Sequence, residues 1–296
     1  MGYKTVAEMA KLWGLTERAV RKYCSIGKID GAKLEDKRYL IPEDTLPPER
    51  KNARKFSENN LLNILKAEKD GKVRGGIYHK VQVNLTYNSN RIEGSKLTED
   101  QTRFIFETST IGADLSGVPV DDVVETSNHF RCIDLIIDNA KKPLAEVLIK
   151  KLHEILKSGT SQSRVTWFRV GDYKLKPNEV GGETTCPPKE VEARVRELLA
   201  EYNAQGKKSI EDIIDFHQRF EKIHPFQDGN GRVGRLIMFK ECLAQNVIPF
   251  VIGEEHRWYY YRGLKEWKSQ RSYLIETCLV AQDRFKAWLN YFNIKY

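Results

Sequence analysis

The sequence lacks any hydrophobic run long enough to cross a membrane. Its longest clean apolar stretches, such as residues 247–252, fall far short of the ~20 residues that a membrane helix needs. The first residues, Met-Gly-Tyr-Lys-Thr, run directly into an amphipathic pattern and give no sign of a secretory signal. We therefore expect a cytoplasmic protein that makes no membrane contact.

Paired cysteines are also missing. The chain has 5 cysteines, an odd number, and no two of them form a Cys-x-x-Cys pair. This usage predicts reduced thiols, neither a disulfide framework nor a zinc site. With 40% hydrophobic and 30% charged residues among 296, the composition excludes the disordered, collagen-like and coiled-coil classes.

The positive charge is concentrated at the N-terminus. The net charge is +8, and residues 1–56 alone carry 13 Lys or Arg against 8 Asp or Glu. This excess places any nucleic-acid contact in the N-terminal segment first. A solvated lysine surface explains the charge alone equally well.

Residues 1–46 are expected to form a winged helix-turn-helix. Thr5 to Glu8 reads as a capping box that begins one helix, and Gly14 ends it. Thr16 can cap a second helix, which ends at Gly27. Ile29 and residues 37–41 then suggest a short hairpin. This order resembles the winged helix-turn-helix of excisionases and MerR-type regulators.

That resemblance predicts contact with duplex DNA through the second helix. Its candidate DNA-binding residues are Arg18, Arg21, Lys22 and Tyr23. A protein-contact role for the module is the alternative. Residues 47–56, which hold two adjacent prolines and mixed charges, are expected to be a linker.

Residues 57–296 read as mainly helical. Apolar residues recur at helical spacing over residues 191–202 and 213–223, and residues 236–239 are apolar all round, which predicts a central, buried helix. Residues 175–188, rich in Pro, Gly and Thr, instead suggest an extended loop or hairpin. The fold class expected is therefore all-α with a small β-hairpin.

The segment from 223 to 235 carries the chemistry. Its Gly-flanked turn feeds a helix N-terminus, whose orphan backbone N–H groups and positive dipole end favour a phosphate. Arg232 and Arg235 are three residues apart, so both guanidinium groups can reach that phosphate. Asp228 beside them makes sense as a ligand of Mg²⁺, and His224 can accept a proton near pH 7. The set indicates phosphoryl or nucleotidyl transfer to a hydroxyl.

Simpler explanations exist for the separate parts of this segment. A lone histidine at a helix end is more often a satisfied cap, and Asp-Gly-Asn-Gly is usually just a turn. Residues 229–234 also spell G-x-G-x-x-G, and Glu254 lies at a tempting distance. We reject a dinucleotide site because residues 213–223 read as an amphipathic helix, not as the buried strand that such a site follows.

As a whole, HPFQDGNGRVGR over residues 224–235 matches each fixed position of H-x-F-x-[DE]-G-N-G-R-x-x-R, the motif of the Fic family. The resemblance implies a Fic-fold helical bundle over 57–296 that transfers AMP from ATP, with Mg²⁺, to a Ser, Thr or Tyr hydroxyl of a target protein. His224 would be the general base and Asp228 the Mg²⁺ ligand. The phosphates would be held by Gly229, Asn230, Gly231, Arg232 and Arg235, while Phe226 would anchor the loop in the core.

A second resemblance concerns residues 89–94, which read SNRIEG and are similar to the family's inhibitory motif [ST]-x-x-x-E-[GN]. Ser89, Glu93 and Gly94 occupy its fixed positions, at the end of an inhibitory helix expected near residues 80–94. Glu93 can pair with Arg235 and so occupy the arginine that should hold the γ-phosphate. The resemblance therefore implies an autoinhibited enzyme.

Two further segments resemble parts of the family. Residues 175–186 correspond to its flap, which would hold the target segment by strand addition. Family members often carry Arg after the Tyr that precedes the flap, whereas Lys174 stands here. Tyr260 and Tyr261 resemble the segment near the adenine pocket, although aromatic residues on a helix more often belong to a core.

Rival functions stay open at this level. Within the family they are removal of AMP, transfer of UMP and kinase-like phosphate transfer, and the complete arginine pair favours AMP transfer over the last. Outside enzymes, the chain could be a DNA-binding regulator whose Fic fold senses nucleotide. A homodimer is one assembly that the sequence allows.

Overall fold

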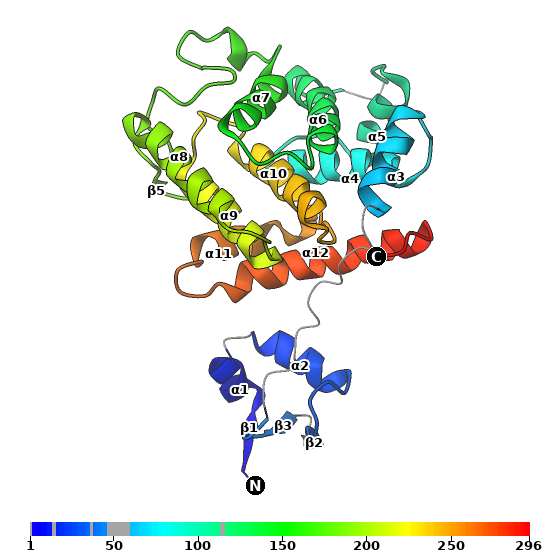
Figure 1. Ribbon diagram of the computed structural model, residues 1–296, viewed down its shortest axis with the longest axis vertical. Helices are drawn as coiled ribbons and strands as arrows, with labels where there is room; N and C mark the ends of the chain where they lie inside the picture. Colours follow the sequence, from blue (N-terminus) through cyan, green and yellow to red (C-terminus); the bar gives the residue numbers. More distant parts are fainter. Residues whose placement is uncertain (1, 14–15, 36–37, 46–59, 113–115) are drawn as a thin grey trace. The chain divides into compact units, whose positions relative to one another are not determined.

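The computed structural model describes residues 2–13, 16–35, 38–45, 60–112 and 116–296. Within these ranges the chain is largely helical (Figure 1). The strands are β1 (Tyr3–Thr5), β2 (Lys33–Glu35), β3 (Arg38–Pro42), β4 (Glu179–Val180) and β5 (Glu183–Thr184). The helices are α1 (Val6–Trp13), α2 (Glu17–Ser25), α3 (Asn60–Asp70), α4 (Ile77–Ile92), α5 (Glu99–Thr108), α6 (Val120–Asp138), α7 (Glu146–Lys157), α8 (Pro188–Ala204), α9 (Ile210–Ile223), α10 (Asn230–Gln245), α11 (Arg257–Lys265) and α12 (Ser272–Tyr291), with 3-10 turns at Gln162–Arg164 and Glu254–His256.

The chain divides into two compact units. The smaller comprises Met1–Asn52 together with Tyr259–Glu276, and the larger comprises Ala53–Trp258 together with Thr277–Tyr296. Among the described residues, each helix is too short or too polar to span a membrane. The five cysteines are free thiols.

The smaller unit packs two helices against a three-stranded sheet of order β1-β3-β2. Both strand pairs are antiparallel, with Lys4 opposite Ile41 and Leu34 opposite Tyr39. The apolar faces of α1 and α2 meet the sheet in a small core of Val6, Met9, Ala10, Val20, Cys24, Ile29 and Ile41.

Local capping explains where these helices begin. Thr5 accepts a hydrogen bond from the Glu8 backbone N–H while the Glu8 carboxylate accepts one from the Thr5 N–H, as the capping box requires. Thr16 caps α2 by accepting from the Ala19 N–H, and its hydroxyl donates to Glu276 at 2.5 Å. Gly14, expected to end the first helix, lies outside the described residues.

The strands of this unit differ from the sequence expectation in position. The hairpin was expected to begin at Ile29, but its first strand is Lys33–Glu35, and Ile29 is instead a buried residue of the preceding turn. A further strand, Tyr3–Thr5, was not expected because its pairing partner lies nearly forty residues away at Pro42.

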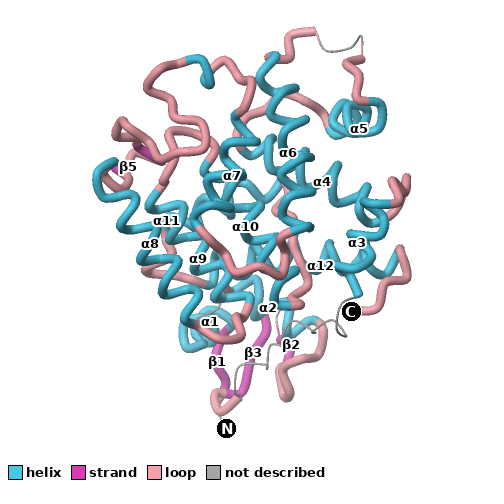
Figure 2. Tube along the Cα trace, turned by 45° about the horizontal axis from the view of Figure 1, so that its top comes forward, coloured by secondary structure: helices cyan, strands magenta, loops and turns pink. Residues whose placement is uncertain are grey.

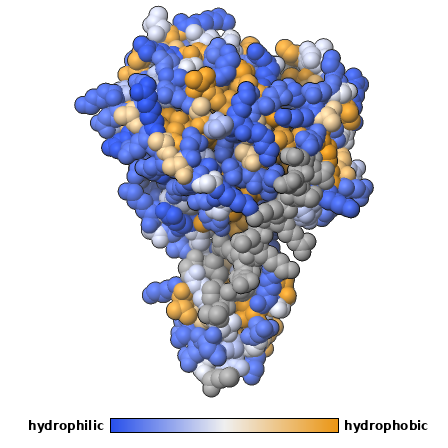
Figure 3. Space-filling model, in the orientation of Figure 1, coloured by the Kyte–Doolittle hydropathy of each residue, from blue (hydrophilic) through white to orange (hydrophobic). Residues whose placement is uncertain are grey.

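The larger unit is a helical bundle around α10, which lies among α4, α6, α7 and α9 (Figures 1 and 2). Residues 236–239 are buried, as expected for a stretch that is apolar all round, and the burial extends over residues 230–243, which include the charged Arg232, Arg235, Lys240 and Glu241. The expected stripe on α8 is buried throughout at Val191, Val195, Leu198, Leu199 and Tyr202. On the face seen in Figure 3 hydrophilic residues dominate the surface of this unit.

A two-stranded hairpin interrupts the helical pattern between α7 and α8. Strands β4 and β5 are antiparallel, and the two-residue turn between them is formed by Gly181 and Gly182, both with positive φ. Because all four strand residues are exposed, the outer edges of the hairpin present backbone groups to solvent. The expected β-hairpin is thus confirmed.

Candidate active site

The site forms where α9 ends and α10 begins. His224 caps α9 in a left-handed conformation, with φ 52°, because Pro225 follows and a helix cannot continue through it. Its backbone N–H still closes the last turn on the Phe220 carbonyl at 2.9 Å. A turn then leads to Gly229, whose φ of 81° suits glycine, and α10 starts at Asn230.

Asn230 and Phe226 fix this turn. The Asn230 side chain accepts from the Phe226 N–H at 2.8 Å and donates to the Phe226 carbonyl at 2.9 Å. The Phe226 ring is fully buried and stacks on His153 with ring centroids 4.0 Å apart. The backbone between His224 and Gly231 is therefore held from both the core and the helix.

The imidazole of His224 has a defined proton arrangement. Its Nδ1 lies 3.3 Å from the Glu221 carbonyl, and since a carbonyl can only accept, Nδ1 carries the proton. The lone pair is then on Nε2. Burial is the main cause that lowers the pKa of His224 to about 4, so the ring is neutral at pH 7.

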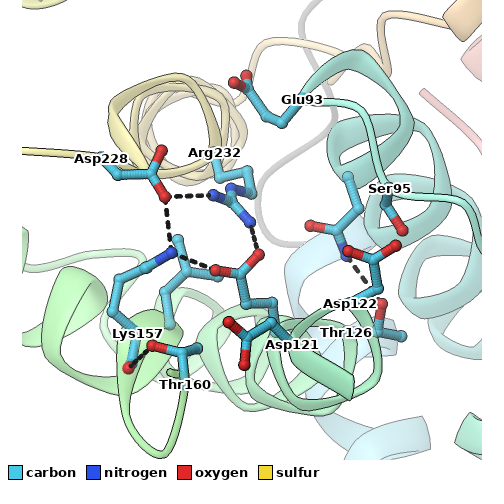
Figure 4. A network of polar contacts seen from close by, with 12 residues as sticks. Glu93, Ser95, Asp121, Asp122, Thr126, Lys157, Thr160, Asp228 and Arg232 are labelled. Carbon is cyan, nitrogen blue, oxygen red and sulfur yellow. Dashed lines mark hydrogen bonds and ion pairs between the residues drawn. The ribbon is translucent and has the colours of Figure 1, made fainter. Parts of the chain in front are cut away.

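The first motif arginine, Arg232, belongs to a closed ring of four charges. It donates to Glu125 of α6 and, at 3.4 Å, to Asp228, and the Lys157 ammonium at the end of α7 bridges the same two carboxylates. The distance from Lys157 Nζ to Asp228 Oδ2 is 2.6 Å. Figure 4 shows Lys157 and Arg232 converging beside Asp228.

Burial differs around this ring. The side chains of Lys157, Arg232 and Glu125 are 2%, 6% and 12% exposed, whereas that of Asp228 is 38% exposed. Burial opposes ionisation of Asp228, but Arg232 and Lys157 outweigh it and hold the pKa of the carboxyl well below its usual range. Asp228 is thus a permanent anion with one side open to solvent.

The second motif arginine, Arg235, has different partners. It donates to Glu93 Oε1 at 2.6 Å and to the Ser89 hydroxyl and carbonyl at 3.0 and 2.9 Å. Glu93 caps the end of α4, and Gly94 follows with φ 99°, which turns the chain away. Ser89 and Glu93 are four residues apart and so share one face of the helix.

The Glu93 carboxylate lies over the first turn of α10. A Cβ atom at position 231 would overlap Glu93 Oε1 and would lie 2.8 Å from an Arg235 guanidinium nitrogen. Only a glycine leaves room for that carboxylate. The space above the first turn of α10 therefore already contains an anionic group.

Other polar contacts hold α4 in place. Glu254 accepts from Arg91 at 2.9 Å and from the Tyr87 hydroxyl at 3.1 Å, while Asn90 donates to Thr126 at 3.1 Å. Glu254 thus anchors α4, and the segment before the Gly-rich turn is helix α9. Both findings agree with the rejection of a dinucleotide site.

Lys174 connects the hairpin to the motif loop. Its ammonium donates to Asn178 at 2.7 Å, to Thr185 at 2.6 Å and to the Ile223 carbonyl at 3.4 Å. Its backbone N–H donates to the Pro225 carbonyl at 2.9 Å. Burial lowers the pKa of Lys174 to about 8.

The structure brings together most residues selected from the sequence: His224, Phe226, Asp228, the three cradle residues, both arginines, Ser89, Glu93 and Gly94. Tyr260 is 1% exposed and Tyr261 is 37% exposed, and their place in an adenine pocket stays a prediction. Arg18, Arg21 and Lys22 of α2 are exposed, and Tyr23 is half-buried.

Sequence reasoning missed Glu125 and Lys157. Lys157 ends an amphipathic helix, where a lysine is usual because it complements the helix dipole. Its carboxylate partners are 32 and 71 residues away, so no local pattern could reveal the ring.

Comparison with known proteins finds similarity over the segment that contains this site. Residues 143–242 match the family model described as Fic/DOC family. The chain is similar to the protein adenylyltransferases Fic of Drosophila mojavensis and Drosophila virilis, each 28% identical over 187 residues, which is 60% of this chain and 35% and 36% of those relatives. The chain thus spans about a third of the length of these curated relatives.

Solved structures share the fold. A Fic domain containing signaling protein from Bacteroides thetaiotaomicron is 23% identical with a TM-score of 0.60, and the match covers 77% of this chain and 94% of that one. Fic-1 from C. elegans is 16% identical with a TM-score of 0.61, over 78% of this chain and 72% of that one. The protein therefore has an all-α Fic fold with a small β-hairpin, and residues 143–242 are similar to the Fic/DOC family.

Proposed function

We propose that this protein transfers AMP from ATP to a hydroxyl group of a target protein. The observation that carries the proposal is the convergence, on one helix start, of an anion cradle, two arginines, a carboxylate and a neutral histidine. Each of these groups matches one need of nucleotidyl transfer. The similarity to protein adenylyltransferases supports ATP as the donor.

In the proposed reaction, His224 acts as general base. The hydroxyl oxygen of the target attacks the α-phosphorus, and the bond from that phosphorus to the oxygen bridging to the β-phosphate breaks. Pyrophosphate leaves, and the hydroxyl proton passes to Nε2 of His224, the nitrogen that carries the lone pair. Arg232 and Arg235 would neutralise the β- and γ-phosphates.

Asp228 fits the role of a Mg²⁺ ligand. Among the described residues, no group of three or more His, Cys, Asp or Glu side chains could hold a metal by itself. Mg²⁺ is commonly bound through one or two carboxylates plus substrate phosphates and water, and Asp228 is the solvent-facing carboxylate of the site. When bound, the ion would neutralise phosphate charge.

The hairpin at 179–184 is suited to hold the target. Its exposed strands can accept an extended segment by strand addition, and Lys174 and Asn178 tie its base to the motif loop. A hydroxyl presented there would lie near His224. Lys174 thus bridges the hairpin and the end of α9 through Asn178, Thr185 and the Ile223 carbonyl.

We further propose that Glu93 inhibits the enzyme. Its carboxylate pairs with Arg235 and overlies Gly231, which supports a state in which one arginine is neutralised and the cradle is blocked. A unit charge pair at 4 Å is worth about 4 kcal/mol at an effective dielectric of about 20, before desolvation is discounted.

The test compares wild type with Glu93→Gly, using ATP labelled at the α-phosphate and incubation with cell lysate. We expect little labelling by wild type and at least about tenfold more by Glu93→Gly, since 1.4 kcal/mol already corresponds to tenfold. Asp70→Gly, at the exposed end of α3, is the matched control. Equal labelling by two folded proteins would show the inhibitory assignment to be wrong.

The same experiment separates the rival chemistries. Label from the α-phosphate of ATP without label from the γ-phosphate indicates AMP transfer, and the opposite result indicates kinase-like transfer. Labelled UTP tests UMP transfer. Loss of label from a premodified target, on addition of the wild-type protein, would indicate AMP removal instead.

We also propose that residues 1–46 bind duplex DNA. Two short helices precede a hairpin, and Arg18, Arg21 and Lys22 are exposed on the second helix, where a recognition helix would need them. Gel shifts of the full chain on fragments of its own promoter region, at low and high salt, test the proposal. No shift at low salt would favour a protein-contact role.

A further inference from the structure

The Lys157 ammonium group forms an ion pair with Asp228, the carboxylate proposed to bind Mg²⁺. Its ammonium is 2.6 Å from Asp228 Oδ2 and also pairs with Glu125, so two carboxylates converge on one positive charge. A divalent cation at Asp228 would bring a second positive charge to the same carboxylate. Like charges this close repel strongly in a partly buried site.

Lys157 cannot simply withdraw into solvent. Its side chain is 2% exposed, and its Cδ lies 3.6 Å from where a Cβ atom on Gly229 would be, directly beneath the motif turn. The Glu125 carboxylate, itself 12% exposed, holds the ammonium from the other side. The positive charge is therefore a fixed part of the site.

We propose that Lys157 is a positioning residue that makes divalent-cation binding at Asp228 depend on bound nucleotide. Without nucleotide, the ammonium neutralises Asp228 and opposes a second cation. When the triphosphate enters, its negative charges offset that repulsion, and metal and nucleotide bind together. The inference rests on the proposed function, because it requires a triphosphate in the cradle.

The same arrangement predicts binding of nucleotide without metal. Lys157 and Arg232 together balance Glu125 and Asp228, so the ring is neutral and does not repel phosphate. Removal of the ammonium would leave one uncompensated negative charge next to the cradle. Metal-free nucleotide would then bind more weakly.

The experiment measures Mn²⁺ binding by electron paramagnetic resonance, in a Glu93→Gly background so that the cradle is open. Mn²⁺ is titrated alone and with α,β-methylene-ATP, which cannot transfer AMP. For the parent protein we expect no saturable Mn²⁺ binding alone, but one bound ion with nucleotide. For Lys157→Met we expect Mn²⁺ to bind without nucleotide, at least about tenfold more tightly than to the parent.

Calorimetry in EDTA supplies the second readout. The parent should bind α,β-methylene-ATP without metal, and Lys157→Met should lose at least about tenfold of that affinity. Lys151→Met is the matched control, because this exposed lysine of the same helix pairs with Glu154 and should change neither result. Equal or weaker Mn²⁺ binding by folded Lys157→Met overturns the proposal.

A second variant guards against loss of structure. Lys157→Gln keeps hydrogen-bond donors for both carboxylates but removes the charge, so it should behave as Lys157→Met does. The titrations of the Glu93→Gly parent also test the proposal by themselves. Mn²⁺ binding to this protein that is equally tight with and without nucleotide overturns the proposal. If neither the parent nor its variants bind nucleotide or transfer label, the proposed function is wrong. The titrations with Mn²⁺ alone would still show whether the charge of Lys157 opposes a cation at Asp228.

Discussion

Arg232 and Arg235 lie three residues apart on the first turn of α10, yet their surroundings differ. Arg235, which is 4% exposed, pairs with the carboxylate of Glu93, which is 27% exposed and stands at the end of a helix. Arg232 is held inside a ring of four charges whose other cation, Lys157, is 2% exposed. The contact of Arg235 with Glu93 can be broken by moving one side chain. The contacts of Arg232 cannot, because the helices that carry its partners are packed together.

Physical chemistry accounts for that difference. Glu93 keeps part of its hydration in the pair with Arg235, so releasing its carboxylate to solvent costs less than releasing a carboxylate that is enclosed on all sides. Removing one member of a buried set leaves an uncompensated charge in a poorly solvated place. The contact between Arg235 and Glu93 is therefore the more easily reversed, and the contacts of Arg232 in the ring are the more permanent.

The largest effect is expected at His224. In the Glu93→Gly background, His224→Ala should lower the rate of AMP transfer about 10²–10⁴-fold, which is the usual contribution of a positioned base. Binding of α,β-methylene-ATP, measured by calorimetry, should be nearly unchanged because the cradle and arginines remain. Equal transfer rates with and without His224 would remove the base from the mechanism.

The second prediction tests the comparison directly. Glu125→Ala should lower the free energy of unfolding by about 3–5 kcal/mol because Lys157 and Arg232 lose a buried partner. Glu93→Ala should cost less, about 1–3 kcal/mol, because the buried Arg235 loses its carboxylate but keeps its hydrogen bonds to the Ser89 hydroxyl and carbonyl. Urea unfolding followed by circular dichroism measures both, and similar losses would contradict the distinction.

The third prediction concerns the contribution of His224 to the pH dependence of the free energy of unfolding. His224 has a pKa of about 4 when folded, against 6.5 for an ordinary histidine, so the unfolded chain binds more protons between these values. Stability is therefore lost as pH falls from 6.5 towards 4. Between pH 7 and 5 this residue should account for about 1–2 kcal/mol.

The measurement is urea unfolding of wild type and His224→Ala at pH 7 and pH 5. The loss on acidification should be smaller in the variant by that amount. His129, His153 and His217, whose pKa values burial lowers to about 3, remain in both proteins and contribute equally. An identical pH dependence in the two proteins would mean that His224 is not buried in its neutral form.

The smallest effect is expected for the cations of the other unit. Arg18 is exposed on α2, whereas Arg21, on the same helix, pairs with Glu17 at 2.9 Å. If the unit binds DNA, Arg18→Ala should weaken binding by about 1 kcal/mol and reduce the salt slope by about one. Fluorescence anisotropy of the full chain at several salt concentrations measures both quantities, and Lys66→Ala on α3 serves as control.

The sequence predicts local features well and distant ones poorly. The capping box at Thr5 depends on residues within three positions and is present in the structure. Strand β1 was missed because its partner lies far along the chain. Register and strand pairing are not encoded in a local pattern.

The candidate site shows the same division. The cradle, both arginines, Asp228 and His224 lie within twelve residues, so one motif reveals them. Glu93 pairs with a residue 142 positions away and was accessible only through a family resemblance. Glu125 and Lys157 had neither a motif nor a resemblance, and only the packing of α6, α7 and α10 brings them together.

Gly231 has a consequence for how the protein responds to its surroundings. The Glu93 carboxylate occupies the space that a side chain at position 231 would need. If the proposed function holds, this carboxylate would act as a tethered competitor of the nucleotide, and its effective concentration at the turn would be set by the position of α4. A partner that displaces the end of α4 would then tighten nucleotide binding without contacting the nucleotide.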